Sequence, residues 1–357
     1  ANTYRLPLDL SYEIDLWGRV RRGFEGARAD AQASAADFIS ARLSLQSEVA
    51  QTYFTLRSTD NQRGILRDTV TLRREAYDLI KPRANAGTAN ELDVARAETE
   101  LATAESELLG LDRNRSQLEN ALAVLTGRPA PQFAIADAGH YHPAVPVVPA
   151  GLPADLLERR PDVASAERQL AAANARIGVA KAAFFPVLNL TASGGYVSGD
   201  LQSLLNWDSH IWSLGPSLSL PIFAGGRNKA NLARSHAVFN ESVARYRQQV
   251  LMAFAEVQEN LSSLQFLGRQ AVVTERATTA ATEAARLARV RYDAGIVGYL
   301  DVVEAERTAL QVRRESARIQ GQRRIATVQL VKALGGGWDG HALLADAIRT
   351  PAQAPAN

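Results

Sequence analysis

His140 and His142 have the spacing in this chain that most resembles a metal site. A structural zinc site needs four nitrogen, sulfur or carboxylate ligands, and a catalytic site needs three. The surrounding proline-rich stretch supplies no further histidine or acidic cluster, and the chain contains no cysteine. We therefore expect both histidines to lie in a loop, and we predict no metal site. A single methionine also gives little support for binding a soft ion such as copper or silver.

Gly225 and Gly226 superficially resemble a glycine-rich phosphate loop. The Gly-Lys-Ser/Thr sequence of such a loop does not follow them, and a bend from a strand into a helix explains both glycines. The sequence also shows no convergent set of acid, base and nucleophile. We predict that the protein is not an enzyme, binds no cofactor and hydrolyses no ATP.

The overall charge gives no reason to expect a nucleic-acid partner. The chain has 40 Lys and Arg against 38 Asp and Glu, a formal net charge of +2. It also contains no run of about 18 apolar residues, the length that a transmembrane helix requires.

The distribution of proline predicts very long helices. Of the 14 prolines, 7 fall in residues 129–161, whereas residues 222–350 contain none. Proline costs about 3 kcal/mol inside a helix, and the proline-poor tracts are rich in Ala, Arg, Glu, Gln and Leu, which favour helix. Gly87 and Gly295 each provide a helix C-terminus followed by a new helical pattern. We predict two helical hairpins, 21–82 with 89–126 and 228–291 with 297–334, and a further helix at 154–182.

The chain repeats itself at an offset of 208 residues. Gly18-Arg19 aligns with Gly226-Arg227, and the Gly87 turn aligns with the Gly295 turn without a gap. Leu92-Asp93-Val94 falls on Leu300-Asp301-Val302 in the same register. We interpret this as an internal duplication. By the same offset, residues 154–207 have counterparts that would precede residue 1, so we expect a missing N-terminal helix and strand.

Three stretches alternate apolar and polar residues, the pattern of a two-faced strand. They lie at about residues 6–16, 186–198 and 212–222, and each has the length of a tilted strand that crosses a bilayer. A half-buried sheet in a water-soluble protein has the same pattern. However, a helix of about 62 residues is roughly 93 Å long, and no soluble core could cover both it and the strands. The predicted lipid-facing residues are Leu8, Leu10, Tyr12, Ile14, Leu188, Leu190, Leu218, Leu220 and Ile222.

Several motifs resemble the TolC family of outer-membrane efflux proteins, and more narrowly the NodT-type outer-membrane factors of RND tripartite efflux systems. Residues 151–162, GLPADLLERRPD, are similar to a hallmark of this family. Further matches are AFFP at 183–186, LPIFAGGR at 220–227 and KALGGGW at 332–338. The resemblance covers essentially the whole chain.

The resemblance implies a mostly helical fold with membrane strands. Three copies form a homotrimer, in which each protomer gives four strands to a shared 12-stranded β-barrel in the outer membrane of a Gram-negative bacterium. The long hairpins form a periplasmic α-barrel. Its implied partners are a periplasmic adaptor (membrane fusion) protein, an inner-membrane RND transporter that supplies the energy, and outer-membrane lipid. The protein would be a passive exit duct for small molecules such as drugs or other toxic compounds.

This architecture divides the chain into seven segments. We expect a membrane strand in 1–20, a periplasmic hairpin in 21–128, an equatorial segment in 129–153 and a helix in 154–185. Two membrane strands with an external loop follow in 186–224, then the second hairpin in 225–335 and a C-terminal equatorial segment in 336–357.

The resemblance also places a closing aperture near the helix turns. We expect the gate at Leu300, Asp301 and Glu304, with Leu92, Asp93 and Arg96 from the first repeat. A leucine ring excludes water and a carboxylate ring selects cations, and an ion pair between Arg96 and Glu304 could hold the closed state. Helix capping is the alternative role for Asp93 and Asp301. The residues expected to contact the adaptor are Gly87, Thr88, Gly295, Ile296 and Val297.

Three other functions stay open at this point. A type I protein-secretion duct belongs to the same family, although the motifs favour small-molecule efflux. A periplasmic adaptor has a long hairpin, but one rather than two, and it carries lipoyl or barrel modules. A coiled-coil scaffold needs no lipid-facing strands.

Overall fold

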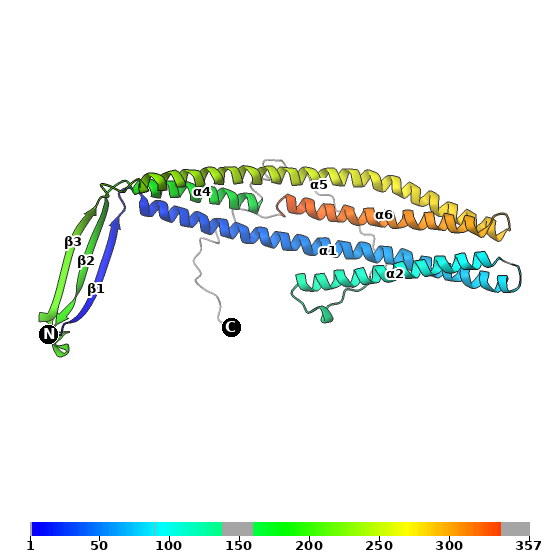
Figure 1. Cartoon of the computed structure of the whole chain (residues 1–357), viewed down its shortest axis with the longest axis horizontal. Helices are drawn as coiled ribbons and strands as arrows, with labels where there is room; N and C mark the ends of the chain where they lie inside the picture. Colours follow the sequence, from blue (N-terminus) through cyan, green and yellow to red (C-terminus); the bar gives the residue numbers. More distant parts are fainter. Residues whose placement is uncertain (1, 89, 138–159, 337–357) are drawn as a thin grey trace. The chain divides into compact units, whose positions relative to one another are not determined.

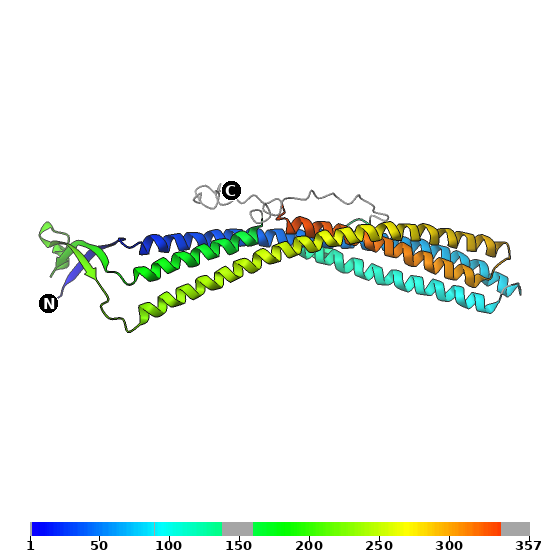
Figure 2. The same cartoon turned by 90° about the horizontal axis from the view of Figure 1, so that it is seen from above.

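The computed structural model describes residues 2–88, 90–137 and 160–336 as long helices with one small sheet (Figures 1 and 2). These residues divide into two compact units. The strand unit consists of residues 2–39 and 161–252, and the hairpin unit consists of residues 40–88, 90–137, 160 and 253–336. Helices α1 (Arg19–Asn85) and α5 (Arg227–Asp293) contribute residues to both units.

Several sequence predictions fall outside the described residues. They are the histidines His140 and His142, residues 138–153 of the predicted equatorial segment, residues 154–159 of the predicted helix, and all but residue 336 of the predicted C-terminal segment. Among the described residues, no three or more His, Asp or Glu side chains are grouped so as to hold a metal ion. No described helix contains a stretch both long and apolar enough to cross a membrane.

The strand unit contains an antiparallel sheet of three strands in the order β1-β2-β3. They are β1 (Tyr4–Ile14), β2 (Val187–Ser198) and β3 (His210–Ser219), and two short 3₁₀ turns, Leu201–Ser203 and Trp207–Ser209, connect β2 to β3. Leu10 pairs with Ala192, which pairs with Leu214, while Asp9 pairs with Ser193, which pairs with Ser213. Directly paired residues share a face of the sheet, so the alternation of each strand adds up to two continuous faces.

The apolar face carries most of the residues that we expected to meet lipid. Its side chains are largely exposed within the chain; Leu8, for example, is 80% exposed. The apolar face consists of Tyr4, Leu6, Leu8, Leu10, Tyr12, Ile14, Leu188, Leu190, Ala192, Gly194, Tyr196, Ser198, His210, Trp212, Leu214, Pro216 and Leu218. The polar face consists of Arg5, Pro7, Asp9, Ser11, Glu13, Val187, Asn189, Thr191, Ser193, Gly195, Val197, Ile211, Ser213, Gly215, Ser217 and Ser219.

The prediction that Leu220 and Ile222 continue the third strand is wrong. Strand β3 ends at Ser219, which pairs with Val187, the first residue of β2. The next residue on the neighbouring strand, Pro186, lies outside β2, and neither Pro186 nor Pro221 has a backbone N–H to donate to a ladder. Leu220 and Ile222 therefore lie in the connection to α5, where Ile222 is 93% exposed.

Helix α4 (Pro161–Ala182) packs against the first part of α1 through small residues. The Cα of Gly26 lies so close to α4 that an added Cβ would be 3.7 Å from both the Ala172 carbonyl and the Ala175 side chain. Farther along, Asp30 and Arg176 form an ion pair of 2.5 Å. Where the helices meet the sheet, Trp17 stacks on Phe185 at 4.6 Å and donates its indole N–H to the Pro186 carbonyl at 2.9 Å.

In the hairpin unit, α2 (Glu91–Leu125) runs beside the C-terminal part of α1, and α6 (Tyr299–Ala333) runs beside that of α5 (Figures 1 and 2). A single 3₁₀ turn, Ala130–Gln132, follows α2. Each bound of α5 and α6 lies 208 residues after the corresponding bound of α1 and α2. The side chain of Ser58 in α1 sits over Gly321 of α6, so a Cβ at Gly321 would overlap it.

The predicted end of the first long helix at Pro82 is also wrong, because α1 continues to Asn85. Pro82 removes the hydrogen bond that an N–H at this position would donate to the Asp78 carbonyl, but its own carbonyl can still accept, so the helix continues for one more turn. The turn is then closed by the bond from the Ala86 N–H to the Pro82 carbonyl at 3.0 Å.

Replacing Gly195 with alanine should weaken the pairing of β1 with β2. A Cβ at Gly195 would overlap the Leu6 carbonyl oxygen and lie 2.9 Å from the Pro7 Cα, and backbone atoms cannot move aside easily. We expect Gly195→Ala to lower the free energy of unfolding by about 1–3 kcal/mol, the usual cost of overpacking. Denaturant unfolding of the detergent-purified protein measures this. Gly194→Ala is the matched control, since a Cβ there meets nothing within 4 Å; equal stability of the two variants would contradict the prediction.

Candidate functional site at the helix tips

Both helix turns close with the same hydrogen-bonded motif. In the first, the Thr88 N–H donates to the Arg83 carbonyl at 2.9 Å and Gly87 has a φ of +72°. In the second, the Ile296 N–H donates to the Arg291 carbonyl at 2.9 Å and Gly295 also has a φ of +72°. Only glycine adopts this left-handed conformation without strain, so each turn is fixed by its own sequence.

The residues predicted to contact a partner are mostly exposed. Gly87, Thr88 and Gly295 are exposed, Ile296 is 66% exposed, and Val297 is half-buried. An isoleucine at the end of a turn, in contact with water, is available for an apolar contact outside the chain.

The two returning helices begin differently. In α2 the Asn90 side chain caps the helix by accepting from the Leu92 N–H at 3.0 Å. In α6 the Asp301 carboxylate accepts from the Gly298 N–H at 3.1 Å. Asp301 therefore has the capping role that we considered as an alternative, whereas Asp93 instead faces Arg96 at 3.5 Å.

Three of the six predicted gate residues lie together. Leu92, Arg96 and Leu300 line one hollow of about 320 Å³ between α2 and α6, and both leucines are exposed. Asp93, Asp301 and Glu304 are not part of its lining. Since the acid that faces Arg96 within this chain is Asp93, the Arg96–Glu304 pair stays a prediction.

Val303, which lines this hollow, also belongs to an apolar core to which the ends of all four helices contribute. Its buried residues are Ile80, Ala97, Tyr299, Val302 and Val303. Burial raises the pKa of the Tyr299 hydroxyl to about 12. Because α1, α2, α5 and α6 all supply side chains to this cluster, the tips of the two hairpins are packed as one group.

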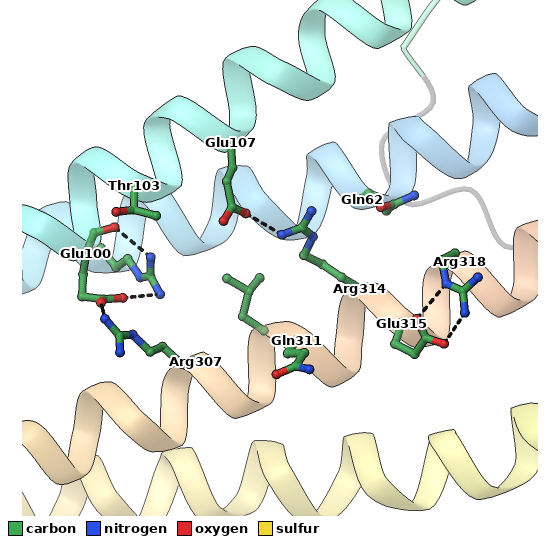
Figure 3. A pocket seen from close by; sticks show the side chains of 11 residues that line it. Gln62, Glu100, Thr103, Glu107, Arg307, Gln311, Arg314, Glu315 and Arg318 are labelled. Carbon is green, nitrogen blue, oxygen red and sulfur yellow. Dashed lines mark hydrogen bonds and ion pairs between the residues drawn. The ribbon is translucent and has the colours of Figure 1, made fainter.

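A layer of charged residues follows beyond the core, and the sequence analysis missed it (Figure 3). Glu100 of α2 is 7% exposed and pairs with Arg73 of α1 at 2.7 Å and with Arg307 of α6. One heptad farther along, Glu107 pairs with Arg314 at 2.5 Å. Side chains of this layer line a cavity of about 610 Å³ between α2 and α6. The signal that could have revealed this layer is a common spacing of seven residues, between Glu100 and Glu107 in α2 and between Arg307 and Arg314 in α6.

This arrangement of duplicated hairpins and a two-faced sheet agrees with the comparisons to known proteins. A family model described as "Outer membrane efflux protein" matches residues 1–128 and 152–336. The chain belongs to the outer membrane efflux protein family. It is an efflux component of the Gram-negative outer membrane, and the family is one of channels and not a class of enzymes.

Two relatives and two solved structures illustrate the similarity. The solvent efflux pump outer membrane protein SrpC of Pseudomonas putida is 38% identical over 335 residues, 94% of this chain and 71% of that protein. The outer membrane protein OprJ of Pseudomonas aeruginosa is 37% identical over 344 residues, 95% of this chain and 71% of that protein. The outer-membrane channel OprN superposes with a TM-score of 0.89 at 32% identity, covering 94% and 76% of the two chains. The open state of the Neisseria gonorrhoeae channel MtrE gives 0.84 at 34% identity, with the same coverage.

Three residues of the GLPADLLERRPD motif lie in the described part of the chain, and each has a physical role: Arg160, Pro161 and Asp162. Arg160 is buried and donates to the Glu256 carboxylate at 2.7 Å and to the Ala333 carbonyl, at the end of α6, at 3.1 Å. A cation there complements the negative end of the helix dipole. Pro161 opens α4, where a missing N–H costs nothing. The Asp162 carboxylate accepts from Gln249 of α5 at 2.6 Å.

A second charged cluster, also missed, surrounds the fully buried Asp60 of α1. Its carboxylate pairs with Arg57 at 3.1 Å, Arg63 at 3.4 Å and Arg115 at 2.8 Å. Two of these arginines hold the segment after α2: Arg57 donates to the Ala136 carbonyl at 2.8 Å and Arg115 to the Ile135 carbonyl at 2.6 Å. The cluster therefore fixes residues 135–137 against the hairpin.

Removing the Arg73 side chain should destabilise the hairpin unit strongly. It would leave the Glu100 carboxylate buried with one fewer cation, and breaking a buried ion pair costs about 3–5 kcal/mol. We expect Arg73→Ala to lose about 3 kcal/mol in denaturant unfolding followed by circular dichroism, because Arg307 still pairs with Glu100. The neighbouring Arg74→Ala removes an exposed pair with Glu105 and should cost less than about 1 kcal/mol. Similar losses in both variants would argue against this assignment.

Glu306 in α6 should show an unusual pH dependence. Burial raises its pKa above 4.5 more strongly than Arg289, 3.6 Å away, and Arg73 lower it. The folded state thus binds this proton more tightly, so its stabilising contribution is complete below about 4.5 and is lost as the pH rises through the folded pKa.

We therefore expect Glu306→Gln to raise the unfolding temperature at neutral pH and to leave it unchanged at acidic pH. Glu315→Gln should have the opposite sign at neutral pH, because the hydrogen bond from Arg318 lowers the pKa of Glu315. Thermal unfolding across a pH series compares the two variants. A Glu306→Gln variant that is less stable than the parent at neutral pH would contradict the assignment.

Proposed function

We propose that three copies of this chain form the passive exit duct of a tripartite efflux pump. The strands β1, β2 and β3 of each copy would form part of a shared 12-stranded barrel in the outer membrane. The strands of one chain are too few to enclose a lumen, whereas 12 are enough. The long hairpins would form a periplasmic tunnel, and the duplicated helices at an offset of 208 would supply its two similar halves in each copy.

One observation carries this proposal: the register of the sheet. It aligns the leucines of three strands on one face and serine, asparagine and acidic residues on the other. The apolar side chains are exposed within a single chain, so something outside it must cover them. In an outer membrane protein, lipid covers the apolar face and water fills the lumen on the polar face.

The sequence shows no ATP-binding phosphate loop, so we propose that a partner protein supplies the energy for transport. An inner-membrane RND transporter would drive transport, and a periplasmic adaptor would join it to the helix tips. Gly87, Thr88, Gly295, Ile296 and Val297 are the contact residues that we propose. Exposure of the Ile296 side chain supports an apolar contact there.

Small molecules are the cargo that the relatives favour. Similar proteins are named for the efflux of solvents in Pseudomonas putida, for the efflux of cations in Escherichia coli and for the export of pyoverdine in Pseudomonas aeruginosa. These cargoes differ in charge and polarity, which fits a duct that does not bind its cargo tightly. No catalytic step is needed for this function.

The gate residues can be tested by single-channel conductance in planar bilayers. We expect Glu304→Ala to raise the closed-state conductance, because it removes a carboxylate from the proposed closing ring. Asp301→Asn should do the same, since asparagine keeps an oxygen that can accept from the Gly298 N–H while the charge is lost.

Two comparisons make this test specific. Glu283→Ala removes an exposed carboxylate of α5 that pairs with Arg286, away from the tips, and it should leave the conductance unchanged. Asp301→Ala removes both charge and cap. If only Asp301→Ala alters the channel, Asp301 acts as a cap and the charge gate is wrong. If no variant forms channels and the parent protein needs no detergent, the duct itself is wrong.

A further inference from the structure

The charged residues on the polar face of the sheet differ in whether they are neutralised. Glu13 at the end of β1 forms an ion pair with Arg19, whose guanidinium donates to it at 2.8 Å through Nε. Asp9 lies near the middle of β1 and is exposed. In the described part of the chain Asp9 has no ion pair, and its neighbours across the sheet are Ser193 and then Ser213.

Asp9 is the charged residue among the three that lie side by side at its position on the polar face, Asp9, Ser193 and Ser213. No residue of β2 or β3 on the polar face is charged, so neither of these two strands compensates the carboxylate. The opposite charge nearest along the strand on this face is Arg5, four residues away. At about 3.3 Å a residue, the two backbone positions are roughly 13 Å apart. This exceeds the Debye length of about 8 Å at physiological salt, so the two charges act separately.

We propose that Asp9 is a charge-selectivity residue in the barrel section of the duct, favouring cationic over anionic solutes. The inference rests on the proposed function, which turns the polar face toward water in the lumen. Each copy then presents one unpaired carboxylate at the same level, and a ring of such charges attracts cations and repels anions. This level lies within the sheet, so it is separate from the proposed gate at the helix tips.

The local potential can be measured with a thiol placed beside Asp9. The chain contains no cysteine, so Ser193→Cys carries one thiol, directly opposite Asp9. Its thiolate attacks the sulfenyl sulfur of a methanethiosulfonate, forming a mixed disulfide and releasing methanesulfinate. The readout is the ratio of modification rates by a cationic and an anionic reagent added outside intact cells. This readout does not require an open periplasmic gate.

We expect the cationic reagent to react faster, and Asp9→Asn to lower the ratio of the two rates about 15-fold at low salt. One unit charge at roughly 5 Å in water changes the rate of each reagent about fourfold, in opposite directions for the two reagents. The effect should shrink at high salt because of screening. Asp9→Glu should keep the ratio. Val197→Cys, opposite Arg5, should show the reverse preference and lose it in Arg5→Gln.

Ala192→Cys separates the two ways in which this idea can fail. Ala192 precedes Ser193 in β2 but lies on the apolar face, so lipid should protect its thiol from both reagents. If Ser193→Cys is as unreactive as Ala192→Cys, or if both react equally, the proposed orientation of the sheet is wrong. If Ser193→Cys alone reacts but Asp9→Asn leaves the rate ratio unchanged, the duct stands and the role of Asp9 is overturned.

Discussion

The helices of this protein are held together at close range by small side chains. Ala33, Ala76, Ala104 and Ala173 are each at most 3% exposed, whereas large buried side chains such as Leu56 and Ile319 are few. Alanine allows helix axes to approach closely, but it buries little apolar area, and each buried methylene contributes only about 0.8 kcal/mol. Long helices packed in this way need additional interactions to fix their register, and the charged clusters supply them.

The charged clusters join the parts that alanine packing alone would leave free to slide. Glu100 ties α2 to α1 and α6, Asp60 ties α1 to α2, and Arg160 joins Glu256 of α5 to the carbonyl at the end of α6. A buried charge tolerates only the register in which its partners are present, because an unpaired one is expensive. We infer that these clusters contribute more to the specificity of the packing than to its overall free energy.

The sequence was sufficient for whatever is encoded locally. The turns at Gly87 and Gly295 were predicted because a positive φ needs glycine, and the two faces of the sheet because alternation has a period of two. The end of β3 was missed because it depends on where its partner strand begins at Val187. The Glu100 and Asp60 clusters were missed because their partners lie as far as 207 residues away in the sequence. Three of the six residues predicted for the gate share a hollow, and of the two roles that the sequence left open for Asp301 the structure shows the capping of α6.

The form of the helix turns has an evolutionary consequence. Each turn is closed by backbone hydrogen bonds and one glycine. The Thr88 hydroxyl donates to the Arg83 carbonyl at 2.8 Å, but the Thr88 backbone N–H already donates to the same oxygen, and the Ile296 turn closes through its backbone N–H. Apart from the glycine, the exposed positions are therefore free to change while the backbone bonds that close each turn are kept. A lineage could exchange one docking partner for another by drifting at these few side chains, while the helices that carry them stay under constraint.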